Sequence, residues 1–210
     1  MNNITFDTNG KLSTEKEDIE WIRIWCEDTN DNTLPRVALI GDSITEGYFR
    51  LVHTALKGIA NVDYLATSYS LKSNAYIEMV KAFVSDSKYA VIHYNYGLHA
   101  YRVNETEYEE GCFSMLSHLN SLAKTVVATS TIVLREDLKT ENADWKEKVR
   151  LRNEILLRIA DELNLNVDNL NGISKELLGD FRMSDGVHFS EKGYEQLAKS
   201  VVESIMKVLK

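Results

Sequence analysis

The sequence predicts one α/β domain in which helices cover both faces of a parallel sheet. Short apolar, β-rich runs alternate along the chain with longer segments of helical periodicity, which is typical of parallel strands joined by crossover helices. Several runs are apolar without polar alternation, as expected of strands buried on both faces. The length of 210 residues fits a single domain that buries roughly 70% of its unfolded surface.

Five strands are expected, in chain order at residues 36–41, 62–66, 89–96, 125–131 and 166–170. A linker at residues 28–35, which holds the only proline, precedes the first strand. Before the linker, residues 14–27 predict an additional helix. Its evidence is a capping box of Thr14 and Glu17 and an apolar side made of Ile19, Ile22, Trp25 and Cys26. We therefore expect a helical extension at residues 1–35, packed as a flap or edge cover on a main domain at residues 36–210.

Two later helices have clear apolar periodicity. The first follows the fourth strand and carries Trp145, Val149, Ile155, Leu156, Ile159 and Leu163 on one side. The second ends the chain, with Ser190 as the expected N-cap and an apolar stripe from Tyr194 to Leu209. Such spacing indicates amphipathic helices that pack on a sheet.

Composition excludes several function classes. The net charge of −8 argues against a non-specific nucleic-acid or anionic-membrane surface, which needs excess Lys and Arg. The N-terminal residues lack the pattern of a secretory signal, and no apolar run approaches the ~20 residues that cross a bilayer. Cys26 and Cys112 are isolated, too few for a disulfide framework or a zinc site. We expect a cytoplasmic protein with no nucleic-acid or membrane partner, whose oligomeric state the sequence leaves open.

The string Gly41-Asp42-Ser43-Ile44 follows the first expected strand directly. In open α/β sheets, ligands bind outside the carboxyl ends of the strands. At a strand-to-helix junction, free backbone N–H groups can also stabilise a developing oxyanion. The competing interpretation is that Ser43 is a helix N-cap, with Glu46 completing a capping box. The motif is not Gly-x-Ser-x-Gly, so the nucleophile elbow of α/β-hydrolases is unsupported.

The string Asp185-Gly186-Val187-His188 precedes the last helix. Its spacing lets the carboxylate fold back onto the imidazole, fix its tautomer and support its protonated form. A serine, an imidazole and a carboxylate are the parts of a nucleophilic triad. The alternative is a plain Asp-Gly turn followed by an incidental surface histidine.

Together the two strings resemble the first and last blocks of the SGNH, or GDSL, hydrolases. The resemblance rests on residues 36–47 and 185–194 and extends over residues 36–210. It implies a flavodoxin-like, three-layer α/β/α fold with a five-stranded parallel sheet. It also implies a carboxylic ester hydrolase that needs no cofactor or metal, with Ser43, His188 and Asp185 as the catalytic triad.

The two middle blocks depart from the family pattern. The second block normally contributes a glycine N–H to the oxyanion hole, and here Leu71 stands at that position and is expected to narrow the acyl pocket. The third block normally reads Gly-x-Asn-Asp, but this chain reads Gly97-Leu98-His99-Ala100. His99, whose ring N–H can also donate, then replaces the asparagine, as in a Gly-Leu-His branch of the family. A satisfied, buried histidine is the alternative.

The resemblance therefore implies an oxyanion hole built from the Ser43 N–H, the N–H near Leu71 and the His99 side chain. Asp42, Tyr96 and Gly97 surround these blocks and are candidate substrate-binding residues. Asn153 matches an asparagine in the family's penultimate helix, although exposed helix polarity explains it equally well. The expected partner is a small-molecule ester, with a short acyl group such as acetyl on a sugar or another polar alcohol.

Two other functions compete. A catalytically weak domain that binds a ligand or partner is compatible with the altered middle blocks. A metal-dependent phosphoesterase would use Asp42, His99, Asp185 and His188 as ligands, although the sequence lacks closely spaced ligand pairs.

Overall fold

The computed structural model describes residues 16–100 and 103–209 and contains one mixed sheet. Its six strands lie in the order β1-β3-β2-β4-β5-β6. In chain order they are β1 (Ile22–Trp25), β2 (Arg36–Gly41), β3 (Asn61–Thr67), β4 (Tyr89–Asn95), β5 (Lys124–Ala128) and β6 (Asn166–Asp168). All neighbours from β3 to β6 pair in parallel, whereas β1 runs antiparallel to β3.

The prediction of five parallel strands is thus incomplete, because a sixth strand occupies one edge. The helix predicted at residues 14–27 is wrong throughout its described part, residues 16–27, which contains no helix. Ile22–Trp25 instead form β1, with Ile22 opposite Thr67 and Trp25 opposite Tyr64. Ile-Arg-Ile-Trp favours an extended chain because of its β-branched and aromatic side chains, and β3 offers an unpaired edge. Thr14, the predicted capping residue, lies outside the described residues. Within the expected edge cover, only Ile22–Trp25 of the described residues form a strand, and this strand lies at the edge of the sheet.

Two predicted strands are also shorter than expected. The fourth ends at Ala128 instead of residue 131. The fifth ends at Asp168, and Leu170 already begins a helix.

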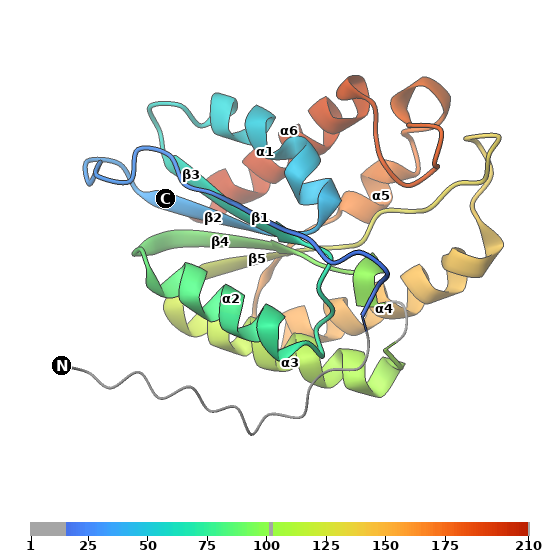
Figure 1. The fold of residues 1–210 in the computed structure, drawn as a ribbon. Helices are drawn as coiled ribbons and strands as arrows, with labels where there is room; N and C mark the ends of the chain where they lie inside the picture. The colour runs from blue at the N-terminus through green and yellow to red at the C-terminus, as the bar shows by residue number, and fades with distance from the viewer. Residues whose placement is uncertain (1–15, 101–102, 210) are drawn as a thin grey trace.

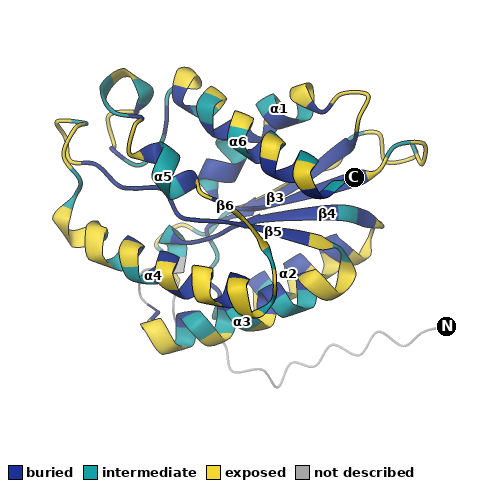
Figure 2. Ribbon diagram, turned by 180° about the vertical axis from the view of Figure 1, so that it is seen from behind, coloured by how far each residue is buried: buried dark blue, intermediate teal, exposed yellow. Residues whose placement is uncertain are grey.

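Helices cover both faces of the sheet (Figure 1). One face carries α1 (Ser43–Ala55), α5 (Leu170–Ser174) and α6 (Glu191–Leu209), and the other carries α2 (Asn74–Ser85), α3 (Glu105–Leu122) and α4 (Ala143–Glu162). Figure 2 shows the sheet buried between the layers, while the outer helix surfaces are exposed. Short 3₁₀ turns follow β4 (Leu98–Ala100) and α5 (Gly179–Phe181). The predicted three-layer arrangement is confirmed. None of the described helices combines the length and apolar character that a membrane span requires.

The strand order places a topological switch at β2. The chain leaves β2 through α1 on one face and reaches β4 through α2 on the other, so β2 lies between β3 and β4. Adjacent parallel strands are about 4.8 Å apart, and loops that follow them meet at one edge. Ser43 begins the helix after β2, Leu71 lies in the loop after β3, and His99 lies in the 3₁₀ turn after β4, at the position where open α/β sheets bind ligands.

Candidate functional site

Ser43 is the first residue of α1, and the residue that caps this helix is Asp42. The Asp42 carboxylate accepts a hydrogen bond from the Ile44 N–H at 2.9 Å. The N-cap interpretation of Ser43 is therefore wrong, and its hydroxyl is available for another partner. The Ser43 N–H belongs to the first turn, where backbone donors have no intrahelical acceptor; among the described residues it has no hydrogen-bond partner.

That other partner is His188. Its Nε2 atom lies 2.8 Å from the Ser43 Oγ, and its Nδ1 atom lies 2.7 Å from Oδ2 of Asp185. Since an ionised carboxylate only accepts hydrogen bonds, Nδ1 carries the proton and Nε2 is free to accept the serine hydroxyl. The three side chains thus form a continuous chain from carboxylate to hydroxyl, the arrangement in which an imidazole can deprotonate a serine.

Asp185 is held in its charged form. Partial burial would raise the pKa of its carboxyl, but hydrogen bonds from the His188 ring and from the His188 and Val187 N–H groups outweigh this, and the pKa is lowered. Both N–H groups donate to Oδ1, at 2.9 and 2.8 Å. Oδ1 therefore binds the backbone of the loop, and Oδ2 binds the imidazole.

Gly186 shapes the loop that carries Asp185 and His188. Its φ angle is +71°, and a Cβ atom here would lie 2.3 Å from the Leu134 carbonyl oxygen. The Leu134 N–H also donates to the Gly186 carbonyl at 2.9 Å. Only glycine combines this conformation with this close approach.

Arg182 holds the same loop through hydrogen bonds to backbone carbonyls, a role that the sequence did not predict. Its buried guanidinium donates to the carbonyls of Ser174 (3.0 Å), Leu177 (2.8 Å), Ile132 (3.2 Å) and Val187 (3.3 Å). It also lies 3.8 Å from the centre of the Phe189 ring. No local sequence signal marks this residue, because its partners are backbone carbonyls of distant segments.

Leu71 lies in the turn between β3 and α2. Its side chain is 5% exposed and belongs to the core on the α2–α3 face, next to Gly111. It also borders a pocket of about 400 Å³ between α2 and α3, and that it narrows an acyl pocket stays a prediction. Its backbone N–H has no partner among the described residues, as required of an oxyanion donor.

His99 lies in the 3₁₀ turn after β4 and is not the satisfied, wholly buried histidine of the alternative interpretation. Its side chain is 19% exposed, and its Nδ1 atom lies 2.8 Å from Oε1 of Glu17. The Trp21 ring packs edge-on against the imidazole at a centroid distance of 6.2 Å. The sequence placed Glu17 in a capping box, so this contact was missed.

The three candidate substrate-binding residues are buried. Tyr96 has no exposed surface, and its hydroxyl donates to the Tyr69 carbonyl at 2.5 Å. Asp42 is 4% exposed, and burial raises the pKa of its carboxyl against the opposing influence of His99, the Ile44 N–H and His188. Gly97 packs so closely on Ser130 that a Cβ would lie 1.7 Å from the Ser130 hydroxyl oxygen. These contacts hold the three residues in the interior beside the site, and their part in substrate binding stays a prediction.

Helix α4 fixes the loop that contains Gly97. Arg152 donates to the Gly97 carbonyl at 2.7 Å. Asn153 is buried and bonds both ways with the Ser130 backbone, donating at 3.0 Å and accepting at 2.8 Å. Exposed helix polarity is thus the wrong explanation for Asn153. No local pattern in the sequence marks Arg152, because its partner is a backbone carbonyl of a distant segment.

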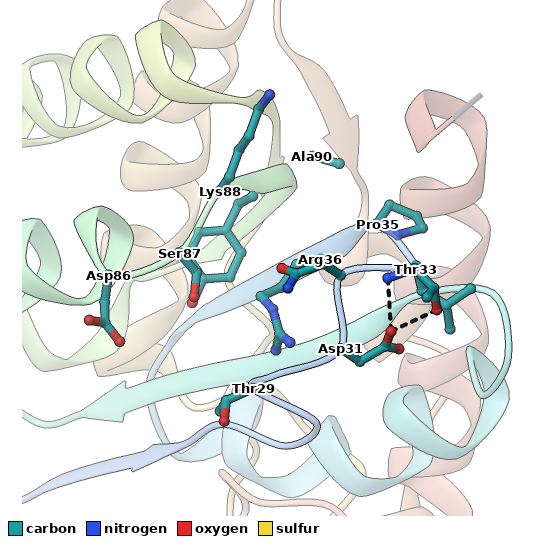
Figure 3. A pocket seen from close by; sticks show the side chains of 12 residues that line it. Thr29, Asp31, Thr33, Pro35, Arg36, Asp86, Ser87, Lys88 and Ala90 are labelled. Atoms are coloured by element: carbon teal, nitrogen blue, oxygen red, sulfur yellow. Dashed lines mark hydrogen bonds between the residues drawn. The ribbon is translucent and has the colours of Figure 1, made fainter.

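Pockets border the molecule at both ends of the sheet. One of about 530 Å³ reaches Asp185 and is lined mainly by polar residues: Leu134, Arg135, Glu136, Asp137, Asn142 and Ser184. Another, of about 540 Å³, lies at the amino ends of β2 and β4, the opposite edge from Ser43, and includes Asp31, Arg36 and Lys88 (Figure 3). Asp31 accepts hydrogen bonds from Thr33 there, in a local turn remote from Ser43, His188 and Asp185.

The four proposed metal ligands are not gathered into one donor cluster. Within residues 16–100 and 103–209, no group of three or more His, Cys, Asp or Glu side chains is placed to hold a metal ion. His188 and His99 each bond a carboxylate through Nδ1 instead.

No protein-family model and no curated protein matches this chain, but solved structures do. Axe2, an acetylxylan esterase from Geobacillus stearothermophilus, matches with a TM-score of 0.69 and 18% identity over 81% of this chain and 94% of its own. AlAXEase, an acetyl xylan esterase, matches with a TM-score of 0.69 and 18% identity over 81% of this chain and 99% of its own. A lipase/acylhydrolase from Enterococcus faecalis matches with a TM-score of 0.67 and 18% identity over 84% of this chain and 97% of its own. At these identities the chain shares their fold.

Proposed function

We propose that the protein is a serine-dependent carboxylic ester hydrolase of the SGNH type. The observation that carries the proposal is the hydrogen-bonded series Asp185–His188–Ser43 at the carboxyl edge of the sheet. The fold shared with acetyl xylan esterases and a lipase/acylhydrolase supports the same reaction class.

The proposed reaction has two halves. Ser43 Oγ attacks the ester carbonyl carbon while its proton passes to Nε2 of His188. The tetrahedral intermediate then expels the alcohol, which takes that proton and leaves an acyl-serine. Water attacks the acyl-serine, again giving its proton to His188, and the carboxylic acid departs as Ser43 regains a proton. Asp185 holds the imidazole and stabilises its protonated form.

Charge on the carbonyl oxygen needs donors in both halves. The Ser43 and Leu71 N–H groups are candidates because neither has a partner among the described residues. His99 is the third, at the end of the neighbouring strand β4. Each such donor is typically worth about 10²–10³ in kcat.

A short acyl group on a polar alcohol is the proposed substrate class. The sequence offers no long apolar segment that could cover a lipid chain, and the chain carries a net charge of −8. The fold neighbours that are acetyl xylan esterases point the same way.

Hydrolysis of p-nitrophenyl acetate, p-nitrophenyl octanoate and an acetylated xylo-oligosaccharide tests this function. We expect turnover of both acetyl esters, at least tenfold higher kcat/KM for acetate than for octanoate, and loss of activity in Ser43→Ala. An octanoate preference would contradict the short-acyl proposal. No hydrolysis by the folded wild-type protein would favour the alternative, a domain that only binds ligands.

A further inference from the structure

The segment at residues 16–21 supplies a carboxylate to the third block of the site. Glu17 and His99 are 82 positions apart in the chain, yet Oε1 and Nδ1 are 2.8 Å from each other. Their side chains are 27% and 19% exposed, so the pair is largely shielded from solvent.

This segment is fixed to the sheet directly before β1. The Trp21 carbonyl accepts from the Thr67 hydroxyl at 2.6 Å and from the Ser68 N–H at 3.2 Å. Glu20 accepts from the Ser68 hydroxyl at 2.8 Å and from the Glu17 N–H at 3.0 Å. Ser68 follows β3, in the loop that leads to Leu71. The edge strand therefore brings Glu17 to the same edge as the other site residues.

The Glu17 contact determines what the His99 ring can do. An ionised carboxylate only accepts, so Nδ1 carries a proton in this pair. Nε2 then donates only when the ring holds its second proton. A charged donor makes a shorter and roughly twice as strong hydrogen bond to an oxyanion as a neutral amide does. In the family that the sequence resembles, the asparagine amide donates without an additional proton and without a carboxylate that orients it.

We propose that Glu17 is a positioning residue of the oxyanion hole, which orients His99 and balances its charge while Nε2 donates to the substrate oxyanion. The proposal rests on the proposed function. It assigns the segment before β1 to the site and explains how a histidine can replace the family's asparagine. His99 itself touches the reacting oxygen, whereas Glu17 acts through His99.

The test compares Glu17→Gln, His99→Asn and the double variant on p-nitrophenyl acetate. Asp18→Asn is the matched control, because it removes the same charge from an exposed neighbouring position. We expect Glu17→Gln to lower kcat about 10–100-fold with KM changed less than twofold, and Asp18→Asn to leave both unchanged. In the His99→Asn background, Glu17→Gln should have no further effect, since the amide does not need the carboxylate.

The possible outcomes separate the two proposals. If Glu17→Gln behaves like Asp18→Asn, or lowers kcat equally in the His99→Asn background, the role of Glu17 is overturned while the esterase proposal stands. If the folded wild-type protein shows no Ser43-dependent turnover, both are overturned. Thermal unfolding of each variant identifies any loss of activity that comes from unfolding. If Glu17→Gln is unfolded, Glu17→Ala takes its place in the same comparison with Asp18→Asn and His99→Asn.

Discussion

The His188 Nε2 atom lies 2.8 Å from the Ser43 Oγ, although the two residues are 145 positions apart in the sequence. The parallel sheet makes this contact possible, because α1 starts at Ser43 directly after β2, and the loop before α6 returns to the same edge. α1 and α6 also pack side by side on one face (Figure 1). The geometry of the proposed triad is thus a consequence of the fold.

Removing the Asp185 carboxylate should uncouple His188 from Ser43. Asp185→Asn loses the charge that supports the imidazolium and allows the wrong ring tautomer, so kcat should fall by about 10³–10⁴. Steady-state hydrolysis of p-nitrophenyl acetate measures this. Asp180→Asn, in the 3₁₀ turn before the same loop, is the control and should retain wild-type kcat; equal losses in both variants would argue against a specific role for Asp185.

Gly186→Ala should destabilise the protein more than Gly179→Ala. Both glycines have positive φ, +71° and +59°, which costs an alanine about 1–2 kcal/mol. At Gly179 a Cβ would have open space, whereas at Gly186 it would lie 2.3 Å from the Leu134 carbonyl oxygen. Urea unfolding should therefore show a larger loss of unfolding free energy for Gly186→Ala, accompanied by a lower kcat. Similar losses in the two variants would mean that the close approach is unimportant.

Arg182→Ala should lower the free energy of unfolding by about 3–5 kcal/mol, because it leaves several buried carbonyls without donors. Burial lowers the pKa of Arg182 to about 10. Burial thus destabilises the charged guanidinium, and its hydrogen bonds to the backbone carbonyls offset this cost. Arg158→Ala removes an exposed arginine that pairs with Glu109 and should change stability by less than about 0.5 kcal/mol. Chemical denaturation of both variants gives the comparison, and a change below 1 kcal/mol for Arg182→Ala would contradict the anchoring role.

Asp42→Asn should alter how stability depends on pH. Burial raises the pKa of Asp42 above its usual 3.8, so the folded state binds a proton more tightly than the unfolded chain does. Its contribution to stability is present below pH 3.8 and is lost as the pH rises through the folded pKa. Asparagine keeps the cap acceptor without the buried charge.

The difference in unfolding free energy, variant minus wild type, should therefore rise with pH above 3.8 and then level off. Subtracting the wild-type curve removes the contributions of the other carboxyl groups. A difference that falls over this range would show that the carboxylate of Asp42 is stabilised in the folded state.

The sequence allowed the parallel sheet, its two helical layers and the contact of Ser43, His188 and Asp185 to be predicted. Buried parallel strands leave continuous apolar runs, and these three residues stand in recognisable strings. Residues whose roles depend on distant backbone were not predictable. Arg182 and Arg152 bind carbonyls supplied by other elements. Local periodicity likewise predicted a helix at Ile22–Trp25, where pairing with the open edge of β3 decides the structure instead.

Glu17 illustrates the same limit at the site. Its spacing from Thr14 fits a helix cap, and only the antiparallel pairing of β1 with β3 brings it to His99. Leu71 could be placed in the correct loop, but the direction of its side chain depends on packing against α3.

Labelling of the folded protein by a fluorophosphonate, followed by peptide mass mapping, tests most directly whether Ser43 is the nucleophile. We expect one phosphonyl group per chain, attached to Ser43, no label in Ser43→Ala, and at least 100-fold slower labelling in His188→Ala. A folded wild-type protein that remains unlabelled, or that carries the label on another residue, would show that Ser43 is not the nucleophile.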